Sequence, residues 1–336
     1  MKIDFTFAVL VYNHTDYIIE HLESIKYQVD KYGKDINVKL IVSDDGSTDD
    51  SICKIDAWLN NNDNLFAKYL ILGDGKNRGV GYSFTSIWEY IEGDSFKILA
   101  GDDTYSYENI FEESDSLSEA DFITGIPLLL INGNVSKSNS LIFHMLATQY
   151  IYEGKSFFSK VKNISVLNTP SLIYRKCFIQ RKDTLNFIRG FRVTEDFPMM
   201  AHLSSIYKNI RFKTVGKVYV YYRRTPGSIY LVENERYNTD KDDVFKYLED
   251  LDTSIVGKLI LRNRRYCFKL GGFWGRFLNL SYYIYILRAA LKFPRIVSFF
   301  SKLNIDEQKH KSHYAFLNSR AKDFELSYLR AGNSDC

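Results

Sequence analysis

The sequence predicts an α/β protein: a mainly parallel sheet flanked by helices, followed by a C-terminal helical region. Two observations predict this fold. In the first hundred residues, β-rich apolar runs alternate with segments of helical periodicity, which is the pattern of βαβ units. The first apolar run is continuous, as expected for a strand covered on both faces of a parallel sheet. With 336 residues, 45% of them apolar, the chain is long enough for one large domain, or for a domain and a smaller one.

The elements follow in a regular order over these residues. We expect strands at 5–12, 38–43, 66–72 and 96–100, helices at 14–27, 47–58 and 83–92, and a glycine-rich loop at 73–81. The spacing of Ile18, Leu22 and Ile25 predicts the first helix. Ser47 or Thr48 is a suitable N-cap for the second.

Polar residues follow three of the strands, at the point where each strand ends. They are Tyr12-Asn13, Asp44-Asp45 and Asp102-Asp103. The carboxyl ends of parallel strands meet at one edge of a sheet, where ligands bind, so we expect these residues to lie together. Adjacent carboxylates repel each other and favour a nearby cation. Oxygen ligands suit Mg2+ or Mn2+ bound with a phosphate-bearing substrate. The alternative for Gly-Asp-Asp is an ordinary surface turn.

The glycine-rich loop, GDGKNRGVG, matches neither common nucleotide motif. No Lys-Ser or Lys-Thr pair follows a GxxxxG, so it is not a P-loop. It is not GxGxxG either, because its third glycine is one residue late and it does not follow the first strand; a Rossmann dehydrogenase is disfavoured. Two interpretations stay open: a flexible connection, or a loop whose backbone approaches a nucleotide.

Four segments resemble family 2 glycosyltransferases, which have the GT-A fold. AVLVYN resembles the family's opening strand, IVSDDGSTDDS resembles VDDGSTDxS, Asn77-x-Gly79 resembles the NxG loop, and ILAGDDTY resembles the strand that ends in the DxD-type metal motif. Ala100 stands where many members carry the first Asp of DxD, so Asp102 and Asp103 both remain candidate metal ligands. Phe84-Thr85 replace the usual Arg-Asn, and Arg78 is a substitute for their base or phosphate contacts.

The resemblance implies a role for each matching residue. It implies a donor nucleotide site that contains Val11, Tyr12, Asn13, Asp45, Gly79 and Asp102. In this site Asp45 accepts a hydrogen bond from the base, and Val11 and Tyr12 give backbone contacts to the nucleoside. Asp102 and Asp103 are the acidic pair that touches the ribose and the Mn2+ or Mg2+ ion.

The ED motif in GFRVTEDFPMM supplies the implied catalytic residues, Glu195 and Asp196, with Asp196 as the general base. A sugar hydroxyl has a pKa far above neutrality, so a carboxylate must take its proton as it attacks the anomeric carbon. The alternative is an acidic pair at a helix N-terminus capped by Thr194. Upstream we expect a strand at 121–131, a polar turn at 132–139 and, at 168–178, a segment that resembles the strand before the acceptor site.

Residues 217–228, KVYVYYRRTPGS, resemble the family's YYRRHPGS strand end. Thr225 stands where the family often has a His that completes the metal shell in some members, so that ligand is expected to be missing. Arg223 and Arg224 either neutralise the donor diphosphate bidentately or form a solvated basic turn.

The resemblance covers residues 3–230, so we predict a GT-A domain at 1–230 and a helical, basic, membrane-apposed region at 231–336. Residues 257–302 contain ten Lys or Arg and no Asp or Glu. Arg288, Lys292 and Arg295 share one helical face, beside an apolar stripe that includes Leu287 and Leu291. This pattern predicts contact with an anionic membrane surface through residues 257–302. The alternative is a helical subdomain packed on the catalytic domain.

Other binding chemistries are disfavoured in this C-terminal region and elsewhere. No nucleic-acid recognition motif accompanies the charge. His310 and His313 have no Cys or carboxylate at ligand spacing and are expected to be solvated. No run of about 18 apolar residues predicts a membrane span. The four cysteines form no CxxC pair, which argues against a structural zinc site and a disulfide framework and fits a reducing compartment.

Together these features predict a metal-dependent, inverting glycosyltransferase of hexosyltransferase type. We expect a nucleotide-sugar donor, UDP-linked, and a saccharide acceptor linked to polyprenyl diphosphate, in bacterial surface polysaccharide synthesis such as O-antigen or capsule. The expected location is cytoplasmic, peripheral at the inner face of the plasma membrane. The alternatives are a sugar-1-phosphate nucleotidyltransferase, which should carry GxGxR where this chain has VYNHTD, and an inactive membrane-surface binding module, suggested by Ala100 and Thr225.

Overall fold

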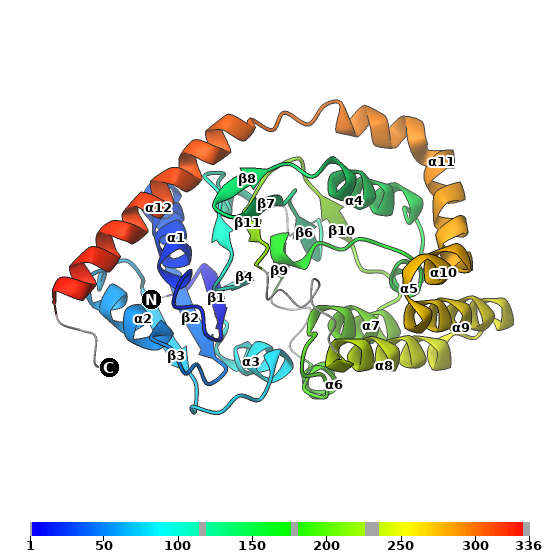
Figure 1. The fold of residues 1–336 in the computed structure, drawn as a ribbon, viewed down its shortest axis with the longest axis horizontal. Helices are drawn as coiled ribbons and strands as arrows, with labels where there is room; N and C mark the ends of the chain where they lie inside the picture. Colours follow the sequence, from blue (N-terminus) through cyan, green and yellow to red (C-terminus); the bar gives the residue numbers. More distant parts are fainter. Residues whose placement is uncertain (1, 114–118, 176–180, 226–234, 332–336) are drawn as a thin grey trace.

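A computed structural model describes residues 2–113, 119–175, 181–225 and 235–331 (Figure 1). The predicted tails of two segments, 176–178 and 226–228, lie outside these residues. A seven-stranded sheet has the order β10-β6-β9-β4-β1-β2-β3, and a four-stranded sheet has the order β5-β11-β7-β8. The larger sheet consists of β1 (Phe5–Val11), β2 (Val38–Asp44), β3 (Lys68–Leu72), β4 (Ser95–Ala100), β6 (Phe122–Thr124), β9 (Leu172–Arg175) and β10 (Phe212–Thr214). The smaller sheet consists of β5 (Thr104–Tyr105), β7 (Leu128–Ile131), β8 (Asn134–Ser136) and β11 (Val220–Arg223).

Helices cover the sheets, as the α/β prediction requires. In chain order the first six are α1 (Ile18–Tyr32), α2 (Ser51–Asn60), α3 (Val80–Ser86), α4 (Asn139–Ile151), α5 (Phe157–Lys162) and α6 (Lys182–Ile188). The others are α7 (Asp196–Ile206), α8 (Glu235–Leu251), α9 (Ile255–Leu270), α10 (Gly272–Phe277), α11 (Leu280–Phe300) and α12 (Glu307–Arg330). The predicted fold class, including a helical region at the C-terminus, is confirmed.

The larger sheet is buried on both faces, which explains the continuous apolar run of β1. Alternate residues of this strand enter different cores: Phe7 and Val9 pack with α1 and α2 on one face, and Ala8 packs with α3 on the other. A third core lies between the smaller sheet and α4, α11 and α12. Burial on both faces is the property that parallel βαβ units impose on their strands.

Strand register sets the position of the polar strand ends. β1 pairs in parallel with β4 on one side and with β2 on the other, with Leu10 opposite Ala100 and Val11 opposite Asp44. Adjacent strands are about 4.8 Å apart. The residues that follow β1, β2 and β4 therefore leave the sheet side by side at one edge, which confirms the prediction for these strands.

Three local predictions were wrong. The run at 121–131 is two strands in different sheets, because Pro127 lacks an N–H for a ladder bond and the chain leaves the larger sheet after β6. The turn at 132–139 contains β8. Helix α2 begins at Ser51 after Asp50, since the Ser47 hydroxyl instead bonds the carboxylate of Asp44, at 2.5 Å.

Two further expectations, one for histidines and one for cysteines, were wrong. His310 and His313 are buried; the Tyr221 hydroxyl lies 2.9 Å from His310 Nδ1. The cysteine spacing argued against a disulfide framework, but Cys53 is disulfide-bonded, whereas Cys267 has a free thiol.

The C-terminal helix returns to the start of the chain. Figure 1 shows α12 beside α1, on the far side of the molecule from α9 and α10. Its Ala321 and Phe324 join the core beneath α1 and α2, and Lys54 of α2 pairs with Glu325 at 2.8 Å. No described helix has the length and hydropathy needed to cross a membrane.

Candidate active site

Asp45 ties the end of β2 to the glycine-rich loop. Its Oδ1 accepts hydrogen bonds from the backbone N–H of Arg78 (2.9 Å) and from the Ser83 hydroxyl (3.0 Å), while Gly79 N–H donates to both carboxylate oxygens. Among the described residues, Gly79 alone donates a hydrogen bond to Asp45 Oδ2. A lone pair of this oxygen therefore remains for a ligand. The loop is therefore held by its backbone against the DDGS turn, which favours the nucleotide-approach interpretation over a loose connection.

Gly79 has no room for a side chain. Its φ is +90°, and a Cβ there would lie 2.6 Å from the carbonyl oxygen of Arg192. The next residue, Val80, donates its N–H to the same oxygen at 3.1 Å. The loop that is hydrogen-bonded to Asp45 is thus in close contact with the segment just before Glu195. The Arg78 guanidinium pairs with Asp74, so it is engaged within the loop.

The end of β1 is shaped for close approach by a ligand. Asn13 has a left-handed backbone (φ 55°), and its Oδ1 accepts a hydrogen bond from Thr48 N–H at 2.8 Å. The Val11 carbonyl accepts the N–H of Asp45 at 2.9 Å. Asn13 and Val11 thus fix the turn. Tyr12 is 44% exposed, and its side chain is the group at this position that a base could contact.

The acidic pair after β4 has two different environments. Asp103 is buried, and its Oδ1 accepts the backbone N–H of Arg223 at 2.7 Å. Burial, and then the charge of Asp102, raise the pKa of Asp103 well above its usual value. Asp102 is partly exposed, and within the described part of the chain no hydrogen bond or ion pair reaches its carboxylate. Asp102 is therefore the member of the pair that is open to a ligand.

A buried ion pair, Glu20–Arg223, contacts the backbone of the Asp102-Asp103 segment. Arg223 forms a salt bridge with Glu20 of α1 and donates from Nε to the Asp102 carbonyl at 2.6 Å. Glu20 also accepts the Tyr314 hydroxyl (3.0 Å to Oε2) and the amide of Asn318, both from α12. The predicted role of Arg223 on the diphosphate does not fit this geometry, because its guanidinium is occupied by Glu20. Arg224 is exposed and remains open to that role.

The ED motif begins α7. Asp196 is its first residue: Oδ1 accepts the N–H of Phe197 (2.6 Å) and Oδ2 accepts the Thr169 hydroxyl (3.0 Å). The cap position is held by Glu195, not by Thr194. Burial, and secondarily the charge of Asp196, raise the pKa of Glu195 to about 8. At neutral pH Glu195 is therefore mostly protonated.

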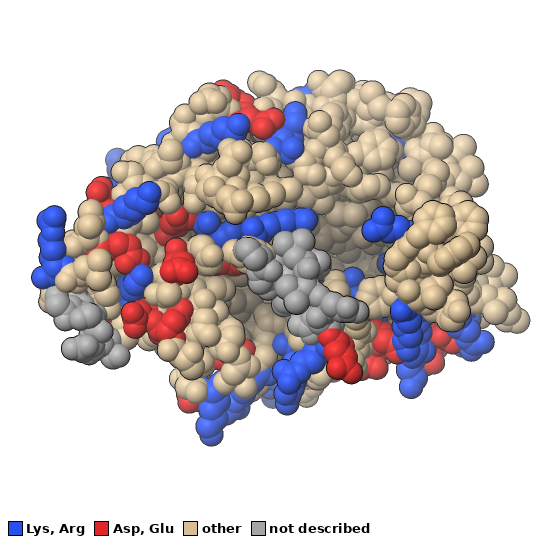
Figure 2. Space-filling model, in the orientation of Figure 1, with Lys and Arg blue, Asp and Glu red and all other residues tan. Residues whose placement is uncertain are grey.

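Tyr222 on β11 links the two acidic groups. Burial raises the pKa of its hydroxyl, and the charges of Asp103, Asp102 and Asp196 add to this effect. The strand-end carboxylates and Asp196 are therefore near enough to Tyr222 for their charges to act on its hydroxyl. Asp45 is connected to the segment before the ED motif through Gly79, which lies against the Arg192 carbonyl. Figure 2 shows a hollow near the middle of this face, where β6 and β10 lie in Figure 1, with Lys or Arg side chains on its rim.

The residues present fit a small divalent cation that is shared with a substrate. Among the described residues there is no group of three or more His, Cys, Asp or Glu that could hold a metal ion. Mg2+-type ions in phosphate-binding sites take one or two carboxylates, and substrate phosphates and water fill the other positions. The open carboxylate of Asp102, next to the buried and charge-poor Asp103, matches that donor set.

Helix α8 contributes residues that sequence patterns do not indicate. Asp240 accepts the N–H of Val193 at 2.9 Å, which fixes the approach to the ED motif. Burial, and then the charge of Asp196, raise the pKa of Tyr237 to about 12. Lys241 lies 4.6 Å from the centroid of the Tyr237 ring; burial lowers its pKa, and the negative charge of Asp196 opposes that change. These three lie beyond residue 230, in a stretch with no motif that could have revealed them.

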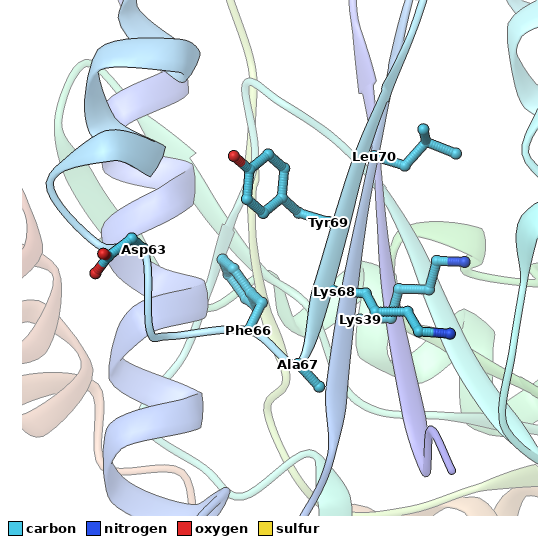
Figure 3. A pocket seen from close by; sticks show the side chains of 7 residues that line it. All are labelled: Lys39, Asp63, Phe66, Ala67, Lys68, Tyr69 and Leu70. Atoms are coloured by element: carbon cyan, nitrogen blue, oxygen red, sulfur yellow. The ribbon is translucent and has the colours of Figure 1, made fainter. Parts of the chain in front are cut away.

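A separate hollow of about 430 Å³ lies at the amino end of β3. Figure 3 shows Lys39 and Lys68 on one side of the strand, and Phe66 and Tyr69 on the other. Both lysines pair with Glu92, at 2.6 and 3.2 Å. Since the acidic residues leave the opposite ends of the parallel strands, this hollow is not part of the candidate active site.

A mainly parallel sheet that gathers carboxylates at the carboxyl ends of its strands defines a ligand-binding α/β protein. The model of the family "Glycosyl transferase family 2" matches residues 6–179, more than half of the sequence. The chain therefore belongs to glycosyl transferase family 2, as the motifs predicted. No curated protein sequence matches the chain.

Solved structures share the fold at low sequence identity. S. aureus TarS matches 96% of this chain with a TM-score of 0.53 and 15% identity, and this chain spans 54% of the TarS chain. S. aureus TarS 1-349 in complex with UDP-GlcNAc has a TM-score of 0.54 and 16% sequence identity, and the match covers 98% of this chain and 92% of that chain. The mannosyltransferase PcManGT from Pyrobaculum calidifontis, in complex with GDP-Man and Mn2+, has a TM-score of 0.53 and 14% sequence identity. This match covers 97% of this chain and 88% of that chain.

Proposed function

We propose that this chain is an inverting glycosyltransferase that moves a sugar from a nucleotide-diphosphate sugar, UDP-linked, to a hydroxyl of a saccharide acceptor. The observation that supports this is the convergence of carboxylates from three distant segments: Asp45, the Asp102-Asp103 pair and Asp196. Neighbours of the same fold are bound to UDP-GlcNAc, or to GDP-Man with Mn2+. The donor nucleotide is assigned to Tyr12 and to the free lone pair of Asp45.

The leaving group is a nucleoside diphosphate, whose charge must be stabilised as the glycosidic bond breaks. A divalent cation held by Asp102, with Asp103 beside it, would supply that stabilisation as a Lewis acid. Asp103 also fixes the backbone of Arg223, so this buried carboxyl has a structural part as well as a chemical one.

Asp196 is assigned as the base that takes the acceptor proton. The Thr169 hydroxyl and the Phe197 N–H fix its carboxylate, and each oxygen keeps a lone pair for the incoming hydroxyl. Glu195, with its raised pKa, holds a proton at neutrality and is the weaker candidate. Holding donor and acceptor in line supplies a further part of the acceleration.

We propose a lipid-linked saccharide as the acceptor, at the cytoplasmic face of the plasma membrane, within surface polysaccharide synthesis. The support is an exposed apolar surface on the C-terminal helices, described in the next section. A hydroxyl acceptor on a lipid carrier would be reached by an enzyme that rests on the bilayer.

The test is a donor screen with the purified chain, Mn2+ and a lipid-diphosphate saccharide, in which nucleotide release, product and anomeric configuration are measured. Asp196→Asn is expected to lower transfer by about a hundredfold or more, with UDP affinity unchanged by calorimetry. Asp243→Asn, an exposed carboxylate of α8, is the matched control and should leave both unchanged. Removal of divalent ions with EDTA should abolish transfer and weaken UDP binding.

Each of the other outcomes rejects part of the proposal. Loss of both transfer and UDP binding in Asp196→Asn would mean that this residue is structural. No nucleotide release with any donor, and no metal-dependent nucleotide binding, would indicate an inactive binding module. Formation of a nucleotide sugar from a nucleoside triphosphate and a sugar 1-phosphate would indicate a nucleotidyltransferase.

A further inference from the structure

Exposed apolar side chains are concentrated on three consecutive helices. Of the 25 large hydrophobic side chains that are exposed in the described chain, 17 belong to residues 255–297, in α9, α10, α11 and the short turns between them. We call these 17 side chains the apolar face. Scattered exposed apolar residues are normal on a protein surface, but a contiguous group of this kind marks an interaction site.

Helical geometry aligns these side chains along α9. Ile255, Leu259, Tyr266 and Leu270 recur at intervals of four, seven and four residues, so they form one stripe within about a quarter of the helix circumference. Leu261, on the opposite side of α9, and Cys267, about a quarter turn from the stripe, are buried. The exposed stripe is therefore a second apolar surface, which no described part of the chain covers.

Helix α11 has the same two-sided character. Tyr285, Ala289 and Ile296 face the core with α4, whereas Leu287 and Leu291 are 64% and 73% exposed. Between the two long helices, Trp274 of α10 is 60% exposed. Figure 2 shows that the part of this view over α10 and α11 is mostly free of charged side chains.

The ten basic residues of this region form three groups. Arg264 stands by itself: it donates a hydrogen bond to the Lys162 carbonyl at 2.9 Å. Four of the ten form ion pairs within the protein: Arg262, Arg265, Lys269 and Arg295. The basic face predicted on α11 is thus partly neutralised, since Arg295 pairs with Glu153. Lys258, Arg276, Arg288, Lys292 and Lys302 form no ion pair with any residue that the structure describes. The apolar face therefore has positive charge at its margins and no acidic residue of its own segment.

We propose that the apolar face lies on the surface of an anionic bilayer, parallel to the membrane plane. Helices of this kind bury their apolar side roughly 5–10 Å into the boundary between headgroups and acyl chains. Tyr and Trp side chains favour that boundary, and each Lys or Arg near an anionic surface adds about 1 kcal/mol of attraction. The cation-rich margin and the aromatic residues are what favour lipid over another occupant.

A second copy of the chain is the competing occupant. A two-fold contact through this face would place the same cations against each other, because both sides of such an interface are the same surface. With no Asp or Glu in residues 257–302, the segment offers no charges of its own that could balance them. A bilayer that contains anionic lipid supplies the missing negative charge.

Membrane binding rests on the proposed function in one respect: access to a lipid-linked acceptor is the reason why the protein would bind a bilayer. Binding to vesicles is measured without any substrate, and donor hydrolysis is measured without any lipid. A chain that hydrolyses donor but ignores vesicles would refute the membrane proposal alone, and the reverse result would refute only the transferase proposal.

The experiment is co-sedimentation of the full chain with vesicles of phosphatidylcholine alone, or mixed with phosphatidylglycerol. We expect binding to the mixed vesicles that weakens with added salt. Leu287→Ser/Leu291→Ser should lower the partition coefficient by about tenfold or more, since two exposed leucines lose their lipid contacts. Arg276→Gln/Lys302→Gln should lower it by a similar factor on mixed vesicles only.

Matched controls come from α12, which also carries exposed leucines and cations. Leu326→Ser/Leu329→Ser and Lys322→Gln/Arg330→Gln should leave vesicle binding unchanged. Circular dichroism melting should show that all four variants stay folded. Equal binding of the α11 and α12 variants would overturn the proposal. So would a dimer in sedimentation velocity that Leu287→Ser/Leu291→Ser dissociates, combined with no vesicle binding, because the face would then be a contact between copies.

Discussion

The buried pair Glu20–Arg223 gives the sharpest quantitative prediction. Its side chains are 10% and 8% exposed, and the Glu20 carboxylate also accepts bonds from Tyr314 and Asn318. Glu20→Gln keeps the shape but removes the charge, so the Arg223 guanidinium stays buried without a counter-ion. Breaking a buried pair from one side costs about 3–5 kcal/mol. We expect about 3 kcal/mol, because the amide oxygen still accepts a bond.

Thermal and denaturant unfolding measure this loss. For a chain of this length, about 3 kcal/mol corresponds to a fall in Tm of about 4 °C. The matched control is Glu153→Gln, which neutralises an exposed pair with Arg295 and should cost less than about 1 kcal/mol. Metal-dependent UDP binding should weaken in Glu20→Gln and not in Glu153→Gln, because Arg223 holds Asp103 and the backbone of Asp102.

A double variant separates loss of the pair from general damage to the core. Glu20→Gln/Arg223→Met removes both charges, so it should cost less than the sum of the two single variants. The reasoning is refuted if the Glu20→Gln cost equals that of the surface control, or if the two single costs add without coupling.

Two other predictions concern the loop and the ED motif. Gly79→Ala should lower the free energy of unfolding by about 2 kcal/mol and weaken nucleotide binding, because its Cβ would overlap the Arg192 carbonyl. The control is Gly75→Ala, which also has a positive φ but has open space around it. In the same unfolding experiments it should cost only about 1 kcal/mol. The raised pKa of Glu195, about 8, means that the folded chain binds this proton more tightly than the unfolded chain. The protonated Glu195 side chain therefore contributes its full share to the free energy of unfolding below about pH 4.3, the pKa of a glutamate in the unfolded chain. This contribution is lost as the pH rises to about 8, at up to about 1.4 kcal/mol per pH unit. Denaturant titrations should find that slope in wild type and not in Glu195→Gln; equal slopes would contradict the assignment.

The parts of the fold that local pattern determines could be predicted from the sequence. Strands β1, β2 and β4 show as apolar runs, and the DDGS turn follows directly from its residues. The order of strands beyond β4 could not be predicted, since β9 runs antiparallel to both its neighbours and its pairing depends on distant segments. Pro127, which separates β6 from β7, signals this break, but the apolar run around it predicts one continuous strand.

The site shows the same division. Asp45, Asp102 and Asp196 sit in motifs, so the sequence alone singles them out. The structure places Asp45 and Asp102 at the same edge of the larger sheet. The groups that hold them do not sit in motifs: Glu20 looks like an ordinary exposed helix residue, and Asp240 belongs to an acidic, mixed stretch. His310 looked solvated because its partner Tyr221 is 89 residues away along the chain. Burial of such residues is a property of tertiary contacts, which no local pattern records.

The return of α12 to α1 has a consequence for how the protein is made. Glu20 leaves the ribosome early, but Tyr314 follows it by 294 residues. At about 5–20 residues per second, the carboxylate waits roughly 15 to 60 seconds for that partner. Until then the Glu20 carboxylate lacks the hydrogen bonds that Tyr314 and Asn318 donate to it in the complete fold. The support behind the acidic pair is thus complete only after α12 has been synthesised.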